Sequence, residues 1–212
     1  MQQFKTVKDE FKNDLEKCDK IATLEWLCRE VLEWEQMQCL QKIMKSDPTM
    51  YAYLVKIVYK SDDGEEADEE KSKLANKVYR GFDKAKFCPG EKDGKVKYED
   101  IRGWIDKFRE LLKSQGQEKL FEHLLGRLLA FSPIGDDGYM PCEAVRQVIE
   151  ENFNDSLKTS YVVAEENKRG VHTVDSGKSE MLLSENYEKN AKKLCNKYPK
   201  TAEIYFALRD SY

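Results

Sequence analysis

The sequence has few residues that interrupt helices and few that are typical of acid-base catalysis. Its 212 residues include only 5 Pro, 11 Gly and 2 His. Scarce Pro and Gly, together with 36% charged and 40% hydrophobic residues, favour helices over sheets or disorder. Because histidine is the usual catalytic base near neutral pH, two histidines leave few options for such chemistry. The composition therefore predicts a helical protein and narrows the classes of enzyme it could be.

Long apolar runs and closely paired cysteines are also missing. No run approaches the roughly 20 apolar residues that a membrane helix needs, and the N-terminal residues lack the apolar centre of a signal peptide. The 6 cysteines contain no C-x-x-C spacing, which favours buried reduced thiols over metal or disulfide chemistry. We therefore expect a cytoplasmic protein that binds no membrane, no metal and no other cofactor.

No large excess of charge of one sign is present. The chain has 36 Lys and Arg against 40 Asp and Glu, which gives a net charge of −4. Both signs alternate at helical spacing, as they do on the solvated faces of ordinary helices. A nucleic-acid partner is not expected, because the sequence offers no basic stripe to follow a phosphate backbone.

What the sequence does contain is a regular return of apolar residues at steps of three and four. This pattern predicts an all-α fold of about ten helices packed in antiparallel pairs. The fold could be an irregular bundle or a short α-solenoid, and no fixed repeat period decides between them. The helices over 101–112 and 120–131 are expected to pair with each other. Residues 155–168 could form a short strand, although their flanks favour a helix.

The first part of the chain carries two clear helix signals. An amphipathic stripe begins at Phe4 and is expected to run on along the chain through Cys18, Ile21, Leu24, Leu27 and Val31. Asp47-Pro48 then predicts a helix start at Pro48, since the Asp side chain can accept free amides of a first turn and Pro is tolerated there. The helix after Pro48 is apolar nearly all round, so we expect it at the centre of the fold.

The main break in the pattern is the stretch 83–97, which contains Pro and Gly. It suggests an N-terminal helical subdomain over 1–82, a connecting loop over 83–97 and a C-terminal helical subdomain over 98–212, together forming one compact unit. The last apolar stripe reaches Tyr212 without a C-cap residue. The chain is therefore expected to be a fragment of a longer protein.

Gly177-Lys178-Ser179 ends like a phosphate-binding loop. Such a loop needs a first Gly five residues before Gly177, between a buried strand and a helix, so that successive amides can surround the phosphates. That position is His172, and no run of Val and Ile precedes it. The better interpretation is a helix that begins near Gly177 and is capped by Asp175 or Ser176, without nucleotide binding.

Two Asp-Gly stretches, 89–100 and 133–144, imitate calcium-binding loops. With Gly94 or Gly138 in the invariant turn position, the first ligand would be Pro89 or Pro133. Proline has no side-chain oxygen to coordinate the ion. Both stretches are therefore interpreted as turns that lead into capped helices, and no metal site is predicted.

The remaining candidate site is the polar loop 165–178. Its charged residues could carry out acid-base chemistry or bind a small ligand if a cleft desolvated them. A polar connection between two helices would show the same pattern. The candidate residues are Glu165, Glu166, Arg169, His172, Asp175 and Lys178. The other histidine, His123, falls opposite the leucine stripe of its helix and is expected to be solvated.

Four stretches resemble the C-terminal helical region of large uncharacterised bacterial multidomain proteins, over residues 20–212. The shared features are an aromatic-rich helix after Asp47-Pro48, Asp93-Gly94 before the helix of Trp104, Arg169-Gly170, and the break at Tyr198-Pro199. The resemblance implies a bacterial fragment and assigns no catalytic residue. The stretches are DPTMYAYLVKIVY, NKRGVHTVDSG, LSENYEKNAKKL and YPKTAEIYFALRDSY.

The function expected from these observations is a non-enzymatic helical protein-interaction or accessory module of a larger bacterial protein. Its partner would be another protein or another domain of the parent chain. The alternative is a small-ligand-binding or hydrolytic domain that uses the polar loop 165–178. An exposed apolar patch would favour the first function, and a cleft with a desolvated, paired His172 or glutamate would favour the second.

Overall fold

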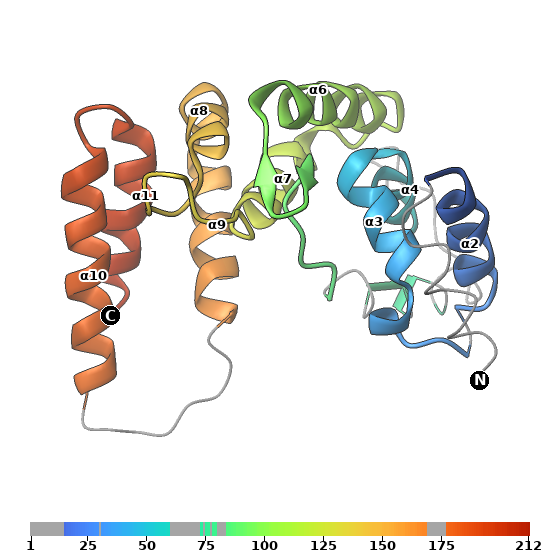
Figure 1. Cartoon of the computed structure of the whole chain (residues 1–212), viewed down its shortest axis with the longest axis horizontal. Coiled ribbons are helices and arrows are strands. Elements are labelled where there is room, and N and C mark those ends of the chain that lie inside the picture. Colours follow the sequence, from blue (N-terminus) through green and yellow to red (C-terminus); the bar gives the residue numbers. More distant parts are fainter. Residues whose placement is uncertain are drawn as a thin grey trace. The chain divides into compact units, whose positions relative to one another are not determined.

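The computed structural model describes residues 15–29, 31–59, 73, 75, 76, 78, 79, 84–168 and 177–212. Helices dominate these ranges, and the all-α prediction is confirmed (Figure 1). The α-helices with defined bounds are α2 (Leu15–Leu27), α3 (Gln38–Ser46), α4 (Thr49–Val58), α6 (Tyr98–Ser114), α7 (Phe121–Leu129), α8 (Glu143–Asn152), α9 (Asp155–Asn167), α10 (Lys178–Leu194) and α11 (Pro199–Asp210). Short elements are the 3-10 turns η1 (Trp34–Gln36) and η2 (Glu118–Leu120) and the strands β1 (Glu91–Lys92) and β2 (Lys95–Val96).

The chain divides into two compact units. Unit 1 consists of Met1–Phe87 and Asp106–Glu118, and unit 2 consists of Cys88–Ile105 and Lys119–Tyr212. The first break falls inside the stretch 83–97 that the sequence marks as a connection. Residues 106–118 belong to unit 1, whereas the predicted division placed them in the C-terminal subdomain. The difference arises because α6 is a single helix that contributes residues 98–105 to unit 2 and 106–114 to unit 1.

Helix α4 lies in the core of unit 1, as its nearly continuous apolar surface predicts. Its first amide, that of Thr49, donates a 2.8 Å hydrogen bond to Oδ1 of Asp47, so the helix begins one residue later than expected. The Tyr51 side chain is only 1% exposed, and its ring centre lies 5.4 Å from that of Phe108 and 5.6 Å from that of Phe87. Helix α3 packs on both α2 and α4.

The apolar stripe expected to continue through α2 is buried only in its first part, where Cys18 and Ile21 are 0% and 9% exposed. For the later residues the prediction is wrong, because Leu24, Leu27 and Val31 are 49%, 63% and 80% exposed. Beyond Ile21 the buried side of α2 passes through Glu25, which is 0% exposed. With 3.6 residues per turn, Leu27 lies on the opposite side of the helix from Cys18. A charged residue has therefore taken the buried position and leucines the exposed ones.

In unit 2, α7 packs on α9 and α10 packs on α11, while α11 also contacts α8 and α9. The expected pairing of the 101–112 and 120–131 helices is replaced by the close pairing of α7 with α9. Gly126 allows this approach, since a Cβ atom there would lie 2.3 Å from the carbonyl oxygen of Leu157. Helix α9 also settles the strand-or-helix ambiguity of 155–168 in favour of the helix.

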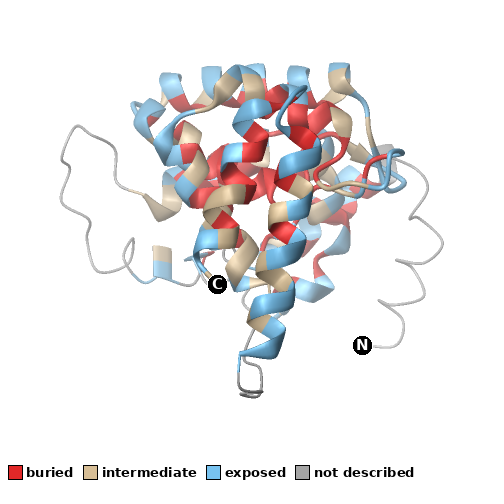
Figure 2. Ribbon diagram, turned by 90° about the vertical axis from the view of Figure 1, so that its left-hand side faces the viewer, coloured by how far each residue is buried: buried red, intermediate tan, exposed pale blue. Residues whose placement is uncertain are grey.

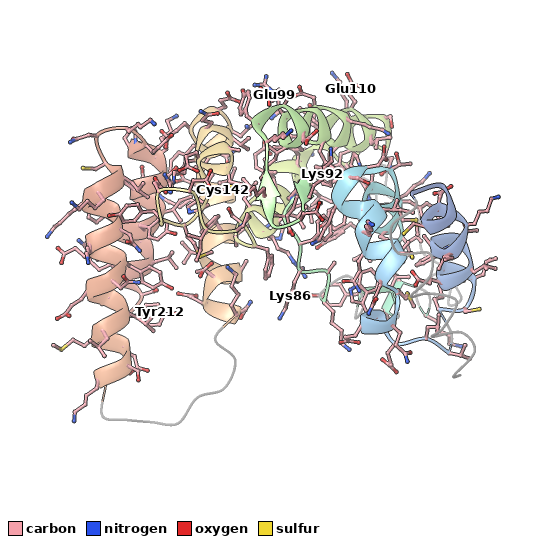
Figure 3. The ribbon with its side chains drawn as sticks, in the orientation of Figure 1. Lys86, Lys92, Glu99, Glu110, Cys142 and Tyr212 are labelled. Carbon is pink, nitrogen blue, oxygen red and sulfur yellow. The ribbon has the colours of Figure 1, made fainter. Side chains whose placement is uncertain are left out.

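Both Asp-Gly turns differ in detail from the expected helix entries. Asp93 and Gly94 have positive φ angles of 51° and 77° and form the two-residue turn of a hairpin in which β1 pairs with β2. Helix α8 begins at Glu143, and its N-cap residue, Cys142, makes no side-chain cap hydrogen bond, although a capped helix was expected. Cys142, labelled in Figure 3, precedes it, and its amide donates 2.9 Å to Oγ of Ser132.

We predict that two glycine substitutions in unit 2 have opposite effects on stability. Gly126→Ala should destabilise the protein by about 1–3 kcal/mol, because the added methyl group would overlap a backbone oxygen of α9. Gly103→Ala should instead stabilise it by about 0.5–1 kcal/mol, because alanine favours helix and no atom lies within 4 Å of its Cβ position. Urea unfolding measures both values. Equal effects at the two sites would contradict the close α7–α9 contact.

Candidate functional site

The structure brings few of the predicted loop residues together. Glu165 and Glu166 lie in the last turn of α9, and Lys178 is the exposed first residue of α10. Among the described residues, no hydrogen bond or ion pair joins Lys178 to either glutamate. Arg169, His172 and Asp175, and the predicted cap residues Asp175 and Ser176, lie outside the described residues.

Glu165 is partly buried and paired, but its partner has a structural role. Nζ of Lys168 lies 2.5 Å from Oε2 of Glu165 and 2.5 Å from the carbonyl oxygen of Ala130. Ala130 follows the last residue of α7, so the ammonium group satisfies a carbonyl at the C-terminus of that helix. The same ammonium lies 5.1 Å from the ring centre of Phe131. The Glu165–Lys168 pair therefore fastens the end of α9 to the end of α7.

Two buried tyrosines in the same unit are also unsuited to act as general bases. Burial, and then the negative charge of Glu165, raise the pKa of the Tyr205 phenol, whose hydroxyl donates 2.6 Å to the carbonyl oxygen of Met140. Burial also raises the pKa of Tyr161 well above its ordinary value. Both phenols stay protonated at neutral pH, which excludes them as general bases.

The most buried charged residue of unit 2 is Arg146, which the sequence analysis did not identify. It is 1% exposed. Its guanidinium donates to Oδ2 and Oδ1 of Asp137 at 2.6 and 2.9 Å and to the carbonyl oxygen of Tyr139 at 2.9 Å. The ring centre of Tyr198 lies 5.4 Å from it. One sequence signal existed: Arg146 occupies an apolar phase of α8, four residues after buried Cys142.

The Arg146 hydrogen bonds lower the pKa of Asp137 from its ordinary 3.8 to about 2. Asp137 also accepts a 3.1 Å hydrogen bond from the amide of Tyr139. The Asp137 carboxylate therefore accepts hydrogen bonds from the guanidinium of Arg146 in α8 and from an amide of its own loop. This arrangement orders the segment that precedes α8, and it leaves the pair engaged in structure instead of ligand binding.

The segment around Arg146 has a counterpart earlier in unit 2. Six residues recur in the same order and at the same spacing, namely Pro89, Asp93, Gly94, Glu99, Arg102 and Ile105 as Pro133, Asp137, Gly138, Glu143, Arg146 and Ile149. The two arginines nevertheless differ. Arg102 is exposed and donates 2.7 Å to Oε2 of Glu151 and 2.9 Å to the hydroxyl of Tyr98. The arginine of the first segment, Arg102, therefore links two helices, and the arginine of the second segment, Arg146, orders a loop.

A serine and a histidine meet between α7 and α9. Oγ of Ser160 lies 2.6 Å from Nδ1 of His123. The side of the imidazole away from this contact is open to solvent, and His123 is exposed as the sequence predicts. Burial, and secondarily the charge of Arg127, lower the pKa of His123. The distance suits a nucleophile and its base. However, Ser160 lies inside α9, where backbone amides serve the helix and are not free to stabilise an oxyanion, and no described carboxylate orients the imidazole.

No family model, curated protein or solved structure matched the chain when it was compared with them. Among the residues that the structure describes, no three His, Cys, Asp or Glu side chains are grouped to hold a metal ion. None of the helices in those ranges has the length and hydropathy to cross a bilayer. The cysteines Cys18, Cys39, Cys88 and Cys142 are buried.

We predict that Asp137→Asn destabilises the protein by about 1–3 kcal/mol near neutral pH, because it leaves Arg146 buried with a weaker partner. Since folding lowers the pKa of Asp137 to about 2, its contribution is present above the unfolded value of 3.8 and is lost as the pH falls towards 2. Urea unfolding of the variant and of the unsubstituted protein at several pH values should show that their unfolding free energies become equal as the pH falls towards 2.

Asp136→Asn provides the matched control for Asp137→Asn. The Asp136 side chain is 93% exposed and lies 3.9 Å from Nζ of Lys95, so its removal should leave stability unchanged. A difference between Asp137→Asn and the unsubstituted protein that stayed constant down to about pH 2 would contradict the assigned ionisation.

His123 should make the protein less stable as the pH falls below its ordinary pKa of 6.5. Folding lowers this pKa, so the unfolded chain binds the proton more readily and the stability contribution is present only at higher pH. His123→Gln keeps an acceptor for Ser160 and should remove this decline between about pH 7 and pH 5. Ser160→Ala keeps the imidazole and should retain the decline. Unfolding free energies across the range test both outcomes.

Proposed function

We propose that the protein is a non-enzymatic helical module that binds another protein, or another domain of a longer chain, through an exposed side of α2. We define the α2 surface by Leu24, Leu27 and Val31. Their exposures of 49%, 63% and 80% are the observation that carries the proposal. Leu24 and Leu27 lie three residues apart on one side of α2, and Val31 lies in the turn that follows the helix.

The α2 surface is costly to leave in water. Burying a large aliphatic side chain contributes roughly 1.5–3 kcal/mol. A partner that covered these three side chains would therefore gain several kcal/mol from a small area, as an amphipathic helix does when its apolar stripe fits a matching one. The occupant that fits best is such a stripe on a partner helix.

Other apolar groups of α2 are covered by their neighbours. The ring centre of Trp26 lies 6.0 Å from that of Tyr53 in an edge-on contact, and the guanidinium of Arg29 lies 4.8 Å from the Trp26 ring. Unit 1 therefore shields the largest aromatic group of this helix and leaves the aliphatic stripe open. This contrast supports a binding role for the stripe.

The alternative of a small-ligand-binding or hydrolytic domain at the loop 165–178 has less support. Glu165 is engaged by Lys168 at the end of α7. Glu166 and Lys178 have no interaction with each other that would assemble an acid-base pair. The His123–Ser160 contact has the right distance for catalysis but no oxyanion donors beside it.

We predict that a photoreactive benzoylphenylalanine at position 27 forms protein adducts in the cells that make the protein. The same group at position 110 is the control, because Glu110 is an exposed residue of unit 1 on α6. The double substitution Leu24→Ser with Val31→Ser should abolish the adducts of position 27 without loss of thermal stability, since both residues are exposed.

The identified partner should bind the purified double variant at least about tenfold more weakly, a change of about 1.4 kcal/mol. Equal adducts at positions 27 and 110, or unchanged affinity of the double variant, would contradict the proposal. Adducts with a second copy of the chain would show self-association in place of a different partner.

A further inference from the structure

Helix α10 has one covered side and one open side. Its main packing partner is α11, and its buried residues are Tyr187, Ala191 and Leu194. The Tyr187 ring centre lies 5.9 Å from that of Tyr205 in the contact with α11. In Figure 2, α10 is the long helix nearest the viewer, and most of the side turned outward is exposed.

The open side carries a defined set of residues, which we call the α10 outer face: Leu182, Glu185, Lys189 and Lys193. Lys189 and Lys193 each stand two residues from Ala191, which places them about 160° around the helix from the buried side. Leu182 is 66% exposed and precedes Lys189 by seven residues, so it lies on the same line.

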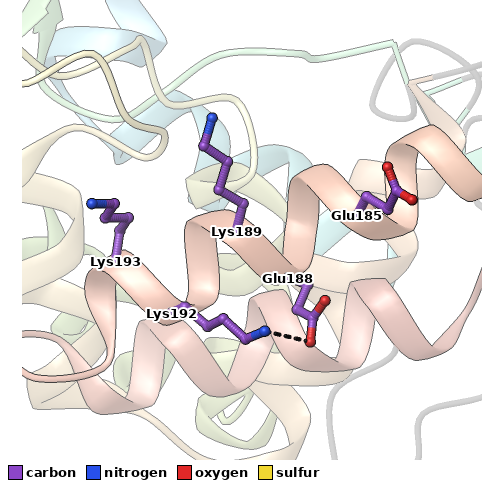
Figure 4. A pocket seen from close by; sticks show the side chains of 5 residues that line it. All are labelled: Glu185, Glu188, Lys189, Lys192 and Lys193. Carbon is purple, nitrogen blue, oxygen red and sulfur yellow. Dashed lines mark ion pairs between the residues drawn. The ribbon is translucent and has the colours of Figure 1, made fainter.

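The lysines of this face are not neutralised within the described part of the chain. Figure 4 shows Lys192 turned towards Glu188, with which it forms a 2.9 Å ion pair. Lys189 and Lys193 point to the other side in the same view and form no ion pair with a described residue. Favourable interaction with the negative helix end explains cations in the last turn, but Lys189 lies before that turn.

The same side chains line an open hollow on the helix surface. Its lining residues are Glu185, Glu188, Lys189, Lys192 and Lys193, all of them charged. A hollow of this kind favours a charged occupant over an apolar one.

We propose that the α10 outer face docks an acidic helical segment of a partner protein, whose carboxylates pair with Lys189 and Lys193 and whose apolar residue covers Leu182. This inference rests on the proposed binding role and adds a second surface, in unit 2, and the chemistry of its partner. Carboxylates repeated every fourth residue of a helix match the spacing of the two lysines.

A polypeptide suits this face better than a nucleic acid. The two cations form a short line that Glu185 shares, and Glu188 lies beside it. A continuous phosphate backbone would meet these carboxylates, whereas a helical peptide can present separate carboxylates to Lys189 and Lys193. Leu182, at the other end of the line, offers an apolar contact that a helical peptide can use.

The test uses the full chain and a fluorescein-labelled helical peptide that has Glu at every fourth position and Leu in one end turn. A peptide with Gln in place of Glu is the ligand control. Anisotropy should show binding of the Glu peptide that weakens with salt, because exposed ion pairs are screened. Lys189→Glu with Lys193→Glu should reduce the affinity at least about tenfold. Leu182→Ser should weaken it as well.

Lys86→Glu with Lys113→Glu is the matched protein control, because both are exposed lysines and the change in net charge is the same. No binding of the Glu peptide, or the same loss in both double variants, would overturn the proposal. It would also be overturned if a single-stranded oligonucleotide, or a phosphatidylserine vesicle, bound through Lys189 and Lys193 more tightly than the peptide.

The two proposals can fail separately because they use different units of the chain. Peptide binding at α10 without specific adducts at position 27 would contradict the α2 surface alone. Specific adducts at position 27 without peptide binding at α10 would contradict the present inference alone.

Discussion

In both units, charged side chains satisfy free backbone groups at the ends of neighbouring helices. A helix leaves its first amides and last carbonyls without internal partners. At the start of α3 the N-cap residue, Met37, offers no side-chain acceptor. Glu25 of α2 supplies it, and its Oε2 accepts a 2.8 Å hydrogen bond from the amide of Leu40. Since Glu25 is fully buried, this bond is made away from water, and it fixes how α2 lies on α3.

The same device recurs in unit 2. Tyr198 cannot cap α11, and Glu150 of α8 accepts hydrogen bonds from the amides of Thr201 at 2.8 Å and Lys200 at 3.2 Å. At the C-terminal end of α7, Nζ of Lys168 donates a hydrogen bond to the carbonyl oxygen of Ala130. These residues look like solvated or catalytic charges when they are considered in the sequence alone. Their contacts show that the polar end of α9 is part of the framework, which is why Glu165, one residue of the predicted acid-base cluster, has a structural task.

Local patterns predicted the helices but not their neighbours or their orientation. The period of apolar residues was sufficient for α4, α6, α10 and α11, and Pro199 marked the start of α11 as it does in the structure. The pairing of α7 with α9 depends on how close Gly126 comes to another helix, which no local pattern records. The hairpin at Asp93-Gly94 could have been predicted from its dipeptide. The apolar phase of Arg146 in α8 indicates its burial, but its partners Asp137 and Tyr139 reach it through the fold of the loop, which spacing does not record.

Stability and binding make different demands on the surface of this protein. Glu25, Glu150 and Arg146 are charged groups with hydrogen-bond partners that the fold needs. Leu27 and Lys189 have the opposite character, because an exposed leucine and a lysine that pairs with none of the described residues add nothing to the packing of their own helices. The charged residues that the fold requires have hydrogen-bond partners inside the chain. Features that the fold does not require, on α2 and on the outer side of α10, are therefore where another molecule can supply the missing contacts.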